Sequence, residues 1–308
     1  MKKLYAIADL HLSYEFNRRA FEELEAHPGD GLILCGDLGE TTEHLELAFR
    51  ISKRNFKEVF WCPGNHELYT VGHSRPDLRG EAKYMHCVEV ARQHGVHTPE
   101  DEFFLWEGGD DDDDPLSSSS SSSAAIIAPI FTLYDYSFRP SDVSRADALR
   151  WAEEKETVAT DEFLLHPDPH GTRDEWCEAL LARFARKMED ARAAHPGVPL
   201  VIANHWPLRE DLVFIPRVPR FSLWCGTTKT EDWHVRFGAK VVVSGHLHVP
   251  RTDWKEGVRF EEVSLGYPRQ WQEARDIGKD VNSLLREILP GPAAPEGGEG
   301  DTRWRRWG

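Results

Sequence analysis

The sequence predicts an α/β fold whose central sheet carries a polar site at the ends of its strands. Short apolar runs alternate with segments of helical periodicity up to Cys62, which is typical of β-α-β units with a parallel sheet. Histidine and aspartate follow directly after several of these runs. Ligands of open α/β sheets bind beyond the carboxyl ends of the strands, so these polar residues mark a candidate functional site.

The first three strands are predicted from apolar runs that two helical segments separate. The runs are Leu4–Ala8, Gly31–Cys35 and Glu58–Cys62, and the helices are Asn17–Ala26 and Thr41–Asn55. Parallel strands need crossover connections of about a dozen residues, and each helix has that length. The order therefore indicates a parallel sheet with crossover helices.

The second half of the chain contains further elements of both kinds. We expect helices at Ala146–Ala159 and Asp174–Ala194, and strands at Pro199–Ala203 and Ala239–Ser244. Val258–Val263 alternates apolar and charged side chains, which is the pattern of a half-exposed strand.

We expect a single domain over residues 1–289 with inserted loops. Five aspartates and then seven serines lie within residues 108–123, and this composition cannot bury a core, so we predict a disordered loop. A calcium loop is the alternative, but the run lacks the alternating spacing and the closing glutamate. Residues 290–308 are rich in proline and glycine and are predicted to be a flexible tail, with a docking peptide as the alternative.

Charge and hydropathy exclude several functional classes. The chain has 53 acidic and 37 basic residues, a formal charge of −16, which argues against binding to nucleic acid or to an anionic membrane. No apolar stretch is long enough to span a membrane. Asp9 interrupts the N-terminal apolar run before it reaches the length of a signal peptide, so we expect a cytoplasmic protein. Five scattered cysteines indicate reduced, buried thiols.

Five short motifs stand at the ends of predicted strands. In chain order they are Asp9-x-His11, Gly36-Asp37-x-x-Glu40, Gly64-Asn65-His66-Glu67, Asn204-His205 and Gly245-His246-x-His248. Each motif alone is more often a hydrogen-bonded structural feature than a ligand set. All five together, each after an apolar strand, predict one shared metal site.

The residue types narrow the choice of metal. Imidazoles with carboxylates and an amide oxygen suit Mn, Fe, Zn or Co, and no cysteine belongs to the motifs, so a zinc–thiolate site is not expected. Seven ligand-type side chains are too many for one ion and suit two, with one carboxylate bridging them. We expect two divalent transition metal ions, Mn and Fe, with Zn or Co as alternatives.

The order of the five motifs resembles the calcineurin-like metallophosphoesterases over most of the chain. The resemblance implies a four-layer α/β/β/α sandwich of two mixed sheets with a dinuclear metal site at strand ends. It assigns one metal to Asp9, His11 and His248, the bridge to Asp37, and the second metal to Asn65, His205 and His246.

The same resemblance implies catalytic and supporting roles. His66 would face the phosphate as an acid or charge stabiliser, beside the catalytic positions Asn65 and Asp37. Glu40 and Glu67 would orient the ligands, although the family more often has aspartate where Glu40 stands.

Several segments outside the motifs are similar to the 4′-phosphopantetheinyl hydrolases of mycobacteria and their actinobacterial relatives. The similar segments are residues 133–138, 159–163, 172–177, 221–230 and 262–269. The resemblance implies a phosphodiesterase that removes the 4′-phosphopantetheine arm from the serine of holo acyl carrier proteins and leaves the apo carrier protein. The partner would be a holo acyl carrier protein, and we expect a monomer.

Substrate contacts are predicted from the chemistry of these segments. The candidates are Lys229, Trp224, Arg173 and Tyr267. Carrier proteins are usually acidic and this chain has a formal charge of −16, so either a local basic patch supports docking, with Arg217, Arg220, Lys229 and Arg236 as its candidates, or the substrate is smaller.

Two other functions remain open at this stage. One is a nucleotide or other small-molecule phosphohydrolase with the same metal site. The other is a non-catalytic scaffold on the same fold, but such scaffolds typically lose ligands or the histidine of the third motif, and His66 is present here.

Overall fold

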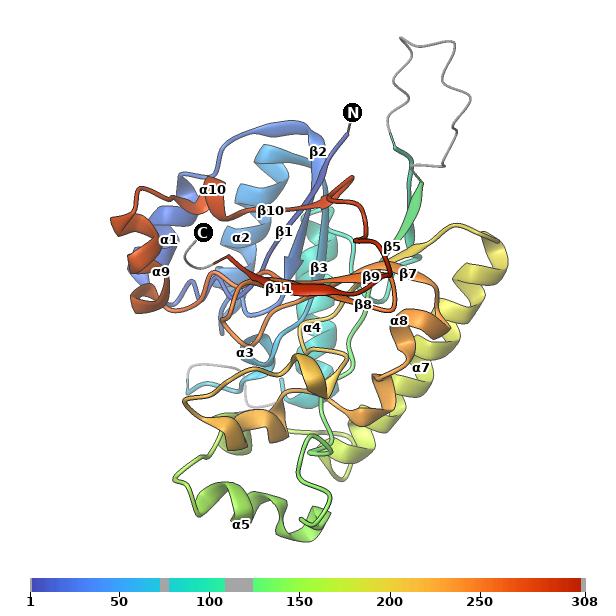
Figure 1. The fold of residues 1–308 in the computed structure, drawn as a ribbon. Coiled ribbons are helices and arrows are strands. Elements are labelled where there is room, and N and C mark those ends of the chain that lie inside the picture. The colour runs from blue at the N-terminus through green and yellow to red at the C-terminus, as the bar shows by residue number, and fades with distance from the viewer. Residues whose placement is uncertain (1, 73–77, 109–123, 306–308) are drawn as a thin grey trace.

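Two β-sheets pack face to face, with helices on their outer faces, in a computed structural model that describes residues 2–72, 78–108 and 124–305 (Figure 1). The first sheet has the strand order β10-β1-β2-β3, and the second has the order β11-β8-β9-β7-β6-β5-β4. The predicted four-layer α/β/β/α sandwich is confirmed.

The first sheet is built by the β-α-β pattern at the start of the chain. Its parallel strands are β1 (Leu4–Ile7), β2 (His27–Cys35) and β3 (Phe56–Cys62), and β10 (Arg286–Leu289) joins β1 in antiparallel orientation. The crossover helices are α1 (Glu15–Glu22) and α2 (Thr42–Asn55), followed by α3 (Asn65–Leu68) and α4 (Gly80–Gln93). The side chain of Thr41 caps α2 by accepting a hydrogen bond from the backbone N–H of His44.

The second sheet is also mixed. Its parallel strands are β5 (Ala125–Pro129), β6 (Leu200–Ala203), β7 (Ala239–Ser244) and β9 (Val258–Glu262). The antiparallel strands are β4 (Phe104–Trp106), β8 (Arg251–Lys255) and β11 (Gly300–Trp304). Both sheets therefore combine parallel and antiparallel neighbours, as expected.

Side chains alternate between two buried clusters along each strand. In β2, Leu32 and Leu34 belong to the cluster that also contains residues of α2, whereas Ile33 and Cys35 join the cluster between the sheets. Val201 of β6 lies in the same inter-sheet cluster. Residues 32–35 of β2 and strand β6 are thus covered on both faces, which explains why these runs are apolar rather than alternating.

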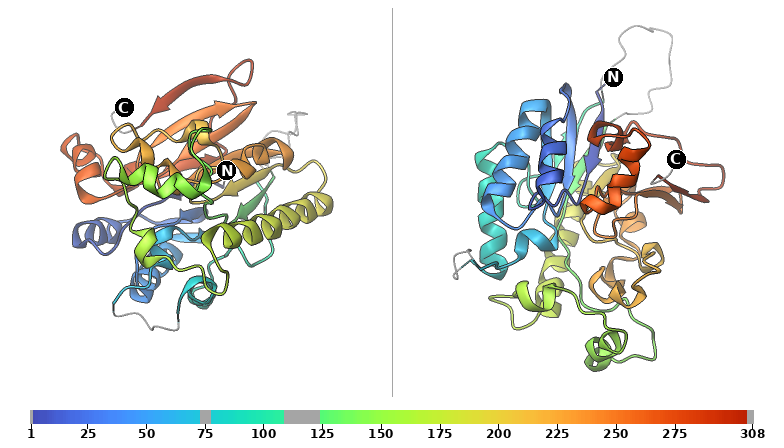
Figure 2. Two further views of the ribbon diagram at one scale, coloured as in Figure 1. Left: turned by 90° about the horizontal axis from the view of Figure 1, so that it is seen from below. Right: turned by 90° about the vertical axis from the view of Figure 1, so that its left-hand side faces the viewer.

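Two long connections lie beyond the carboxyl ends of the strands, at the end of the sheets where α3 lies (Figure 1). The β5–β6 connection contains η1 (Arg145–Asp147), α5 (Ala148–Glu153), α6 (Asp161–Leu164) and α7 (Arg173–Ala194). The β6–β7 connection contains η2 (Glu210–Leu212), η3 (Pro219–Trp224), η4 (Thr228–Thr230) and α8 (Trp233–Arg236). Figure 2 shows α7 (yellow-green) on the opposite side of the sheets from α1 and α2 (blue).

The C-terminal part differs from the expected flexible tail. After α9 (Pro268–Asp276), α10 (Val281–Leu284) and β10, residues 300–304 form β11 and pair with β8. The guanidinium of Arg305 then binds the buried carboxylate of Glu261. A buried carboxylate needs a cation, and composition alone does not show that this segment supplies one.

Three further predictions from the sequence concern a helix, a loop and the absence of a membrane span. The helix predicted over Ala146–Ala159 is shorter, because α5 ends at Glu153. The Asp/Ser-rich loop lies almost wholly outside the described residues. No helix that the structure describes is both long and apolar enough to cross a bilayer.

Candidate metal centre

All seven predicted ligands lie at the carboxyl ends of strands, and both sheets contribute them. Asp9 and His11 follow β1, Asp37 follows β2, and Asn65 begins α3 directly after β3. From the second sheet come His205, after β6, and the pair His246 and His248, after β7. All seven side chains are buried. The site therefore spans the junction between the sheets, where five strand ends converge.

The ligand-type atoms form three overlapping groups in which one such atom from each residue lies within 4.8 Å of the others. The groups are Asp9, His11 and His248; Asp37, His205 and His246; and His11, Asp37 and His66. Asp37 is common to the second and third groups and thus stands between the two histidine sets. This is the arrangement that a bridging carboxylate requires.

The histidine tautomers suit cation binding. The Nδ1 of His248 lies 2.8 Å from the side-chain oxygen of Gln270, and the Nδ1 of His205 lies 2.9 Å from the carbonyl oxygen of Cys35. Both partners are acceptors, so both Nδ1 atoms carry the hydrogen, and Nε2 faces the cluster. The Nε2 of His248 is 2.9 Å from Asp9 Oδ1, and that of His205 is 3.5 Å from Asp37 Oδ2.

The buried carboxylate of Asp37 favours a positive charge beside it. Burial acts to raise the pKa of the Asp37 carboxyl, but His205 and His66 lower it well below its ordinary value. Burial likewise acts to lower the pKa of His205, but Asp37 raises it to about 10. The Asp37 carboxylate thus favours the ionised form and draws a proton to His205, and a divalent cation would displace that proton.

The backbone adopts left-handed conformations at five of the seven ligands. The φ angles are 55° at Asp9, 43° at His11, 55° at Asp37, 71° at His246 and 54° at His248. Such conformations cost about 1–3 kcal/mol each for a residue with a side chain and cluster at functional sites. The fold thus holds the ligand loops in place against local preference.

Two glycines permit the close approach of these loops. A Cβ on Gly64 would lie 2.1 Å from Asp37 Oδ1, and one on Gly245 would lie 2.4 Å from Asp9 Oδ2. Neither position has room for a side chain. The glycines of the third and fifth motifs are therefore needed for space around the carboxylates.

Glu67 joins the loops that follow β2 and β3. Its carboxylate accepts hydrogen bonds from the backbone N–H groups of Asp37 (3.0 Å), Leu38 (2.8 Å) and Gly64 (2.9 Å). Burial and the charge of Asp37 raise its pKa to about 7. Glu67 thus orients the backbone of a ligand, which agrees with the predicted supporting role, and it does so through amides rather than histidines.

Glu40 supports His66 directly. Its Oε1 lies 3.0 Å from His66 Nδ1, which leaves Nε2 of His66 on the cluster side, 3.8 Å from Asp37 Oδ2. Burial opposes protonation, but Asp37 and Glu40 raise the pKa of His66 to about 9. The imidazole is therefore held with a proton at the wall of the cleft described next.

A cleft with a volume of about 630 Å³ opens over this cluster. Part of its lining consists of polar residues of the cluster, including His66 and Asp37. Another part is apolar and comes from the β5–β6 connection, the β6–β7 connection and the loop after β7; it contains Val158, Ala159, Leu164, Ile215, Val218, Phe221 and Leu247. Among the described residues, no lysine or arginine lines the cleft.

Only one of the four predicted substrate contacts lines this cleft among the described residues. Tyr267 does so, and its ring stacks on His11 at a centroid distance of 4.3 Å. Trp224 is buried and donates to Glu162 (2.8 Å), and Arg173 binds the same carboxylate (3.0 Å). Lys229 pairs with Glu178 on α7. The polar groups of Trp224, Arg173 and Lys229 thus bind acidic side chains, and none of the three residues lines the described cleft.

Most cations of the expected basic docking patch form ion pairs with acidic side chains of the same chain. Arg220 pairs with Glu154, and Arg236 pairs with Glu189. With Lys229 held by Glu178, three of the four cations already have acidic partners. Spacing in the sequence could not show these pairs, because each joins segments more than forty residues apart.

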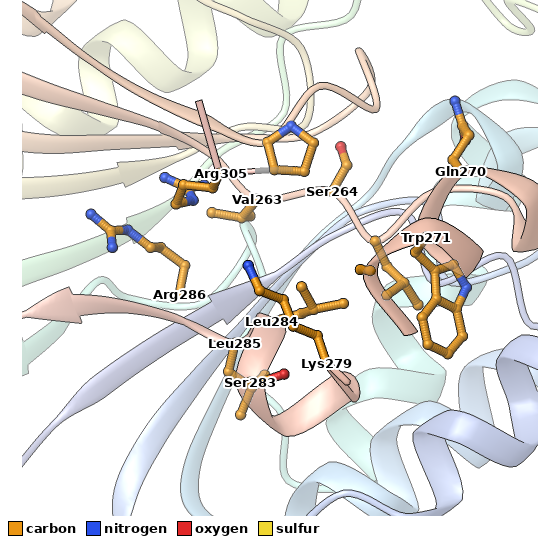
Figure 3. Close-up of a pocket in the computed structure, with 13 residues that line it drawn as sticks. Val263, Ser264, Gln270, Trp271, Lys279, Ser283, Leu284, Leu285, Arg286 and Arg305 are labelled. Carbon is orange, nitrogen blue, oxygen red and sulfur yellow. The ribbon is translucent and has the colours of Figure 1, made fainter. Parts of the chain in front are cut away.

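Sequence reasoning missed several residues that hold the ligands. Ser264 donates to Asp9 Oδ2 (2.7 Å), and Gln270 orients His248. Both follow β9, so the rule that strand ends carry functional residues would have found Ser264. A small second pocket of about 130 Å³ lies behind this segment, with Ser264 and Gln270 in its wall (Figure 3). Tyr69 and Asp161 were missed as well and contact Asn65.

Comparison with known proteins agrees with this geometry. The family model described as calcineurin-like phosphoesterase matches residues 2–250. The chain is 41% identical over 291 residues to "[Acyl-carrier-protein] phosphodiesterase PptH" of Mycobacterium tuberculosis (strain ATCC 25618 / H37Rv), covering 94% of this chain and 84% of that protein. The crystal structure of phosphopantetheinyl hydrolase (PptH) from the same species superposes with a TM-score of 0.83 at 42% identity, covering 96% of this chain and 98% of that one. The chain therefore belongs to the calcineurin-like phosphoesterase family.

Proposed function

We propose that the protein is a dinuclear metal-dependent phosphodiesterase that hydrolyses the bond between 4′-phosphopantetheine and serine in holo acyl carrier proteins. The products would be the apo carrier protein and free 4′-phosphopantetheine. One observation carries the proposal: Asp37, Asn65, His66, His246 and His248 line one cleft, beside the buried ligand-type groups of Asp9, His11 and His205, in a chain 41% identical to an acyl-carrier-protein phosphodiesterase.

The side chains at the cleft fit two divalent cations. Asp9, His11 and His248 would hold one and Asn65, His205 and His246 the other, with Asp37 bridging. Imidazole, carboxylate and amide donors suit Mn and Fe, with Zn or Co as alternatives. When bound, such a pair supplies a water of lowered pKa and positive charge around the phosphate oxygens.

His66 is the group that can supply a proton to the departing serine oxygen. Its Nδ1–H is directed at Glu40, so in the imidazolium form the second proton would stand at Nε2, which faces the cluster. Water would form the new bond to phosphorus and release a proton to solvent, the phosphorus–oxygen bond to serine would break, and the serine oxygen would leave with the proton from Nε2. An alkoxide leaves poorly, so this transfer should contribute strongly for a serine ester.

The apolar wall favours a neutral arm on the phosphate. A phosphate placed at the polar side leaves its substituent against Val158, Ile215 and Val218. The pantetheine arm is uncharged and carries methyl groups, so it suits such a wall. A nucleoside polyphosphate would need cationic contacts, and no lysine or arginine lines this cleft within the described part of the chain. A nucleotide hydrolase is therefore the less favoured alternative, and a scaffold would not need the full ligand set.

The test is intact-mass spectrometry of a holo acyl carrier protein incubated with enzyme loaded with Mn and Fe. Loss of one phosphopantetheinyl group, absent with the His66→Ala variant, supports the proposal and identifies the cleaved bond. An unchanged mass, from enzyme that still hydrolyses a chromogenic phosphodiester, would refute the carrier-protein substrate and retain the metal chemistry.

A further inference from the structure

A buried carboxylate from the β5–β6 connection reaches the metal centre. Asp161 begins α6, is 1% exposed and lines the cleft. Its Oδ1 accepts a hydrogen bond from the hydroxyl of Tyr69 (2.6 Å) and one from Nδ2 of Asn65 (3.0 Å). Nδ2 of Asn65 also donates to the hydroxyl oxygen of Tyr69 (2.8 Å). The three side chains form a closed triangle of hydrogen bonds.

This triangle fixes which end of the Asn65 amide faces the cluster. Both N–H groups are used by Tyr69 and Asp161, so the oxygen points elsewhere, and Oδ1 is buried without a hydrogen-bond partner among the described residues. The terminal torsion of asparagine is broad and roughly two-fold, so the side chain itself does not prefer one orientation. The reversed amide would place its oxygen against the carboxylate of Asp161, which is repulsive.

We propose that Asp161 is a positioning residue that holds the oxygen of Asn65 toward the second metal position. The inference rests on the proposed function, because it assumes that Asn65 is a ligand there. Asp161 acts through Asn65 and has no role in bond cleavage. Residues that orient ligands in this way typically contribute 10- to 100-fold to metal affinity or activity, as an order of magnitude.

The segment around Asp161 is attached firmly enough for this role. The backbone N–H of Thr70 donates to Leu164 (2.9 Å), and Tyr69 and Leu165 form a β-bridge. Arg173 donates to the carbonyl of Asp161 (2.6 Å) and to that of Leu165 (2.9 Å). Arg173, which we expected to meet substrate, thus anchors the backbone that presents Asp161.

The experiment compares three single variants that keep the size of the side chain. Asp161→Leu removes the acceptor, whereas Asp161→Asn keeps an acceptor oxygen and serves as the conservative rescue. Glu162→Gln is the matched control, because Glu162 is the neighbouring acid, binds Arg173 and Trp224, and makes no hydrogen bond to Asn65 in the described structure. Each protein is loaded with Mn, and bound metal per chain is measured by elemental analysis, beside turnover of a chromogenic phosphodiester.

We expect Asp161→Leu to lose one of two metal ions, or to bind it about 10- to 100-fold more weakly, with a matching fall in turnover. Asp161→Asn and Glu162→Gln should keep both ions. A merely structural role would affect Asp161→Leu and Glu162→Gln alike. Full metal content and normal turnover in Asp161→Leu would overturn the proposal.

If Asp161→Leu does not fold, Tyr69→Phe provides the test. It removes one acceptor from the Asn65 amide and one donor to Asp161, so we expect affinity for the second ion to fall about 2- to 10-fold. Affinity equal to that of the unchanged protein would refute the proposal. Failure of the proposed function is distinguishable, since the unchanged protein would then bind no metal pair or would not cleave holo carrier protein.

Discussion

The apolar wall of the cleft provides a direct test of how substrate is selected. Val158 and Val218 line the cleft and are 45% and 47% exposed, so about half of each side chain is free to be covered by a bound arm. Full burial of a valine side chain stabilises by about 1.5–3 kcal/mol. Covering the exposed part would then contribute about 0.7–1.4 kcal/mol per residue, which is about a 3- to 10-fold change in affinity.

We therefore expect Val158→Ser and Val218→Ser each to lower kcat/KM for holo carrier protein by about 3- to 10-fold. The two residues belong to different connections of the chain, so the double variant should lower it by about 10- to 100-fold if the effects add. Turnover of bis(p-nitrophenyl) phosphate should change little, because a small diester does not reach the whole wall.

The matched control is Val235→Ser on α8. Val235 is 54% exposed and does not line the cleft, so the same chemical change should leave both activities unaltered. The assay measures initial rates on both substrates with equal metal content. Equal losses on the two substrates, or no loss on carrier protein, would refute the idea that this wall binds the arm.

Three further predictions concern the metal centre. His66→Ala should lower kcat for holo carrier protein by about 10²- to 10⁴-fold and leave two bound metals, as rates and elemental analysis would show; loss of metal instead would make His66 a ligand. Gly64→Ala should destabilise the protein by about 1–3 kcal/mol and reduce metal content, because the added Cβ would meet Asp37; unchanged thermal denaturation would contradict this. Chelation of the metal should lower Tm, and added Mn should restore it, because metal that binds only the folded protein stabilises that state. A Tm that does not depend on metal would contradict such binding.

The seven candidate ligands could be located from the sequence because they obey a positional rule. Strands such as Leu32–Cys35 and Val241–Val243 are recognisable as apolar runs, and the residue after a parallel strand lies at a known edge of the sheet. The side chains that orient the ligands obey no such rule. Asp161 meets Asn65 across 96 residues, and nothing in the local pattern marks that contact.

Three of the four predicted substrate contacts do not line the described cleft, for a related reason. Trp224 and Arg173 look like binding residues because they are large or charged, but Glu162 receives a hydrogen bond from each of them. A buried acid must be paired, and the pairing decides which cations and donors remain free for substrate. Tyr267 faces the cleft because it follows β9 at the strand ends, where the positional rule again applies.

Seven residues of the β5–β6 connection, 158–164, contribute both to the apolar wall of the cleft and to the metal centre. Val158 and Leu164 line the cleft, while Asp161 between them holds the amide of Asn65. The two tasks should nevertheless be separable, because Val158 makes its contribution from an exposed side chain and Asp161 from a buried one. Val158→Ser should therefore retain both metals and lower kcat/KM for carrier protein by about 3- to 10-fold, whereas Asp161→Leu should lose metal and turn over both substrates more slowly. If Val158→Ser also lost metal, this short segment would respond as one unit, and substrate binding would be coupled to the second metal position.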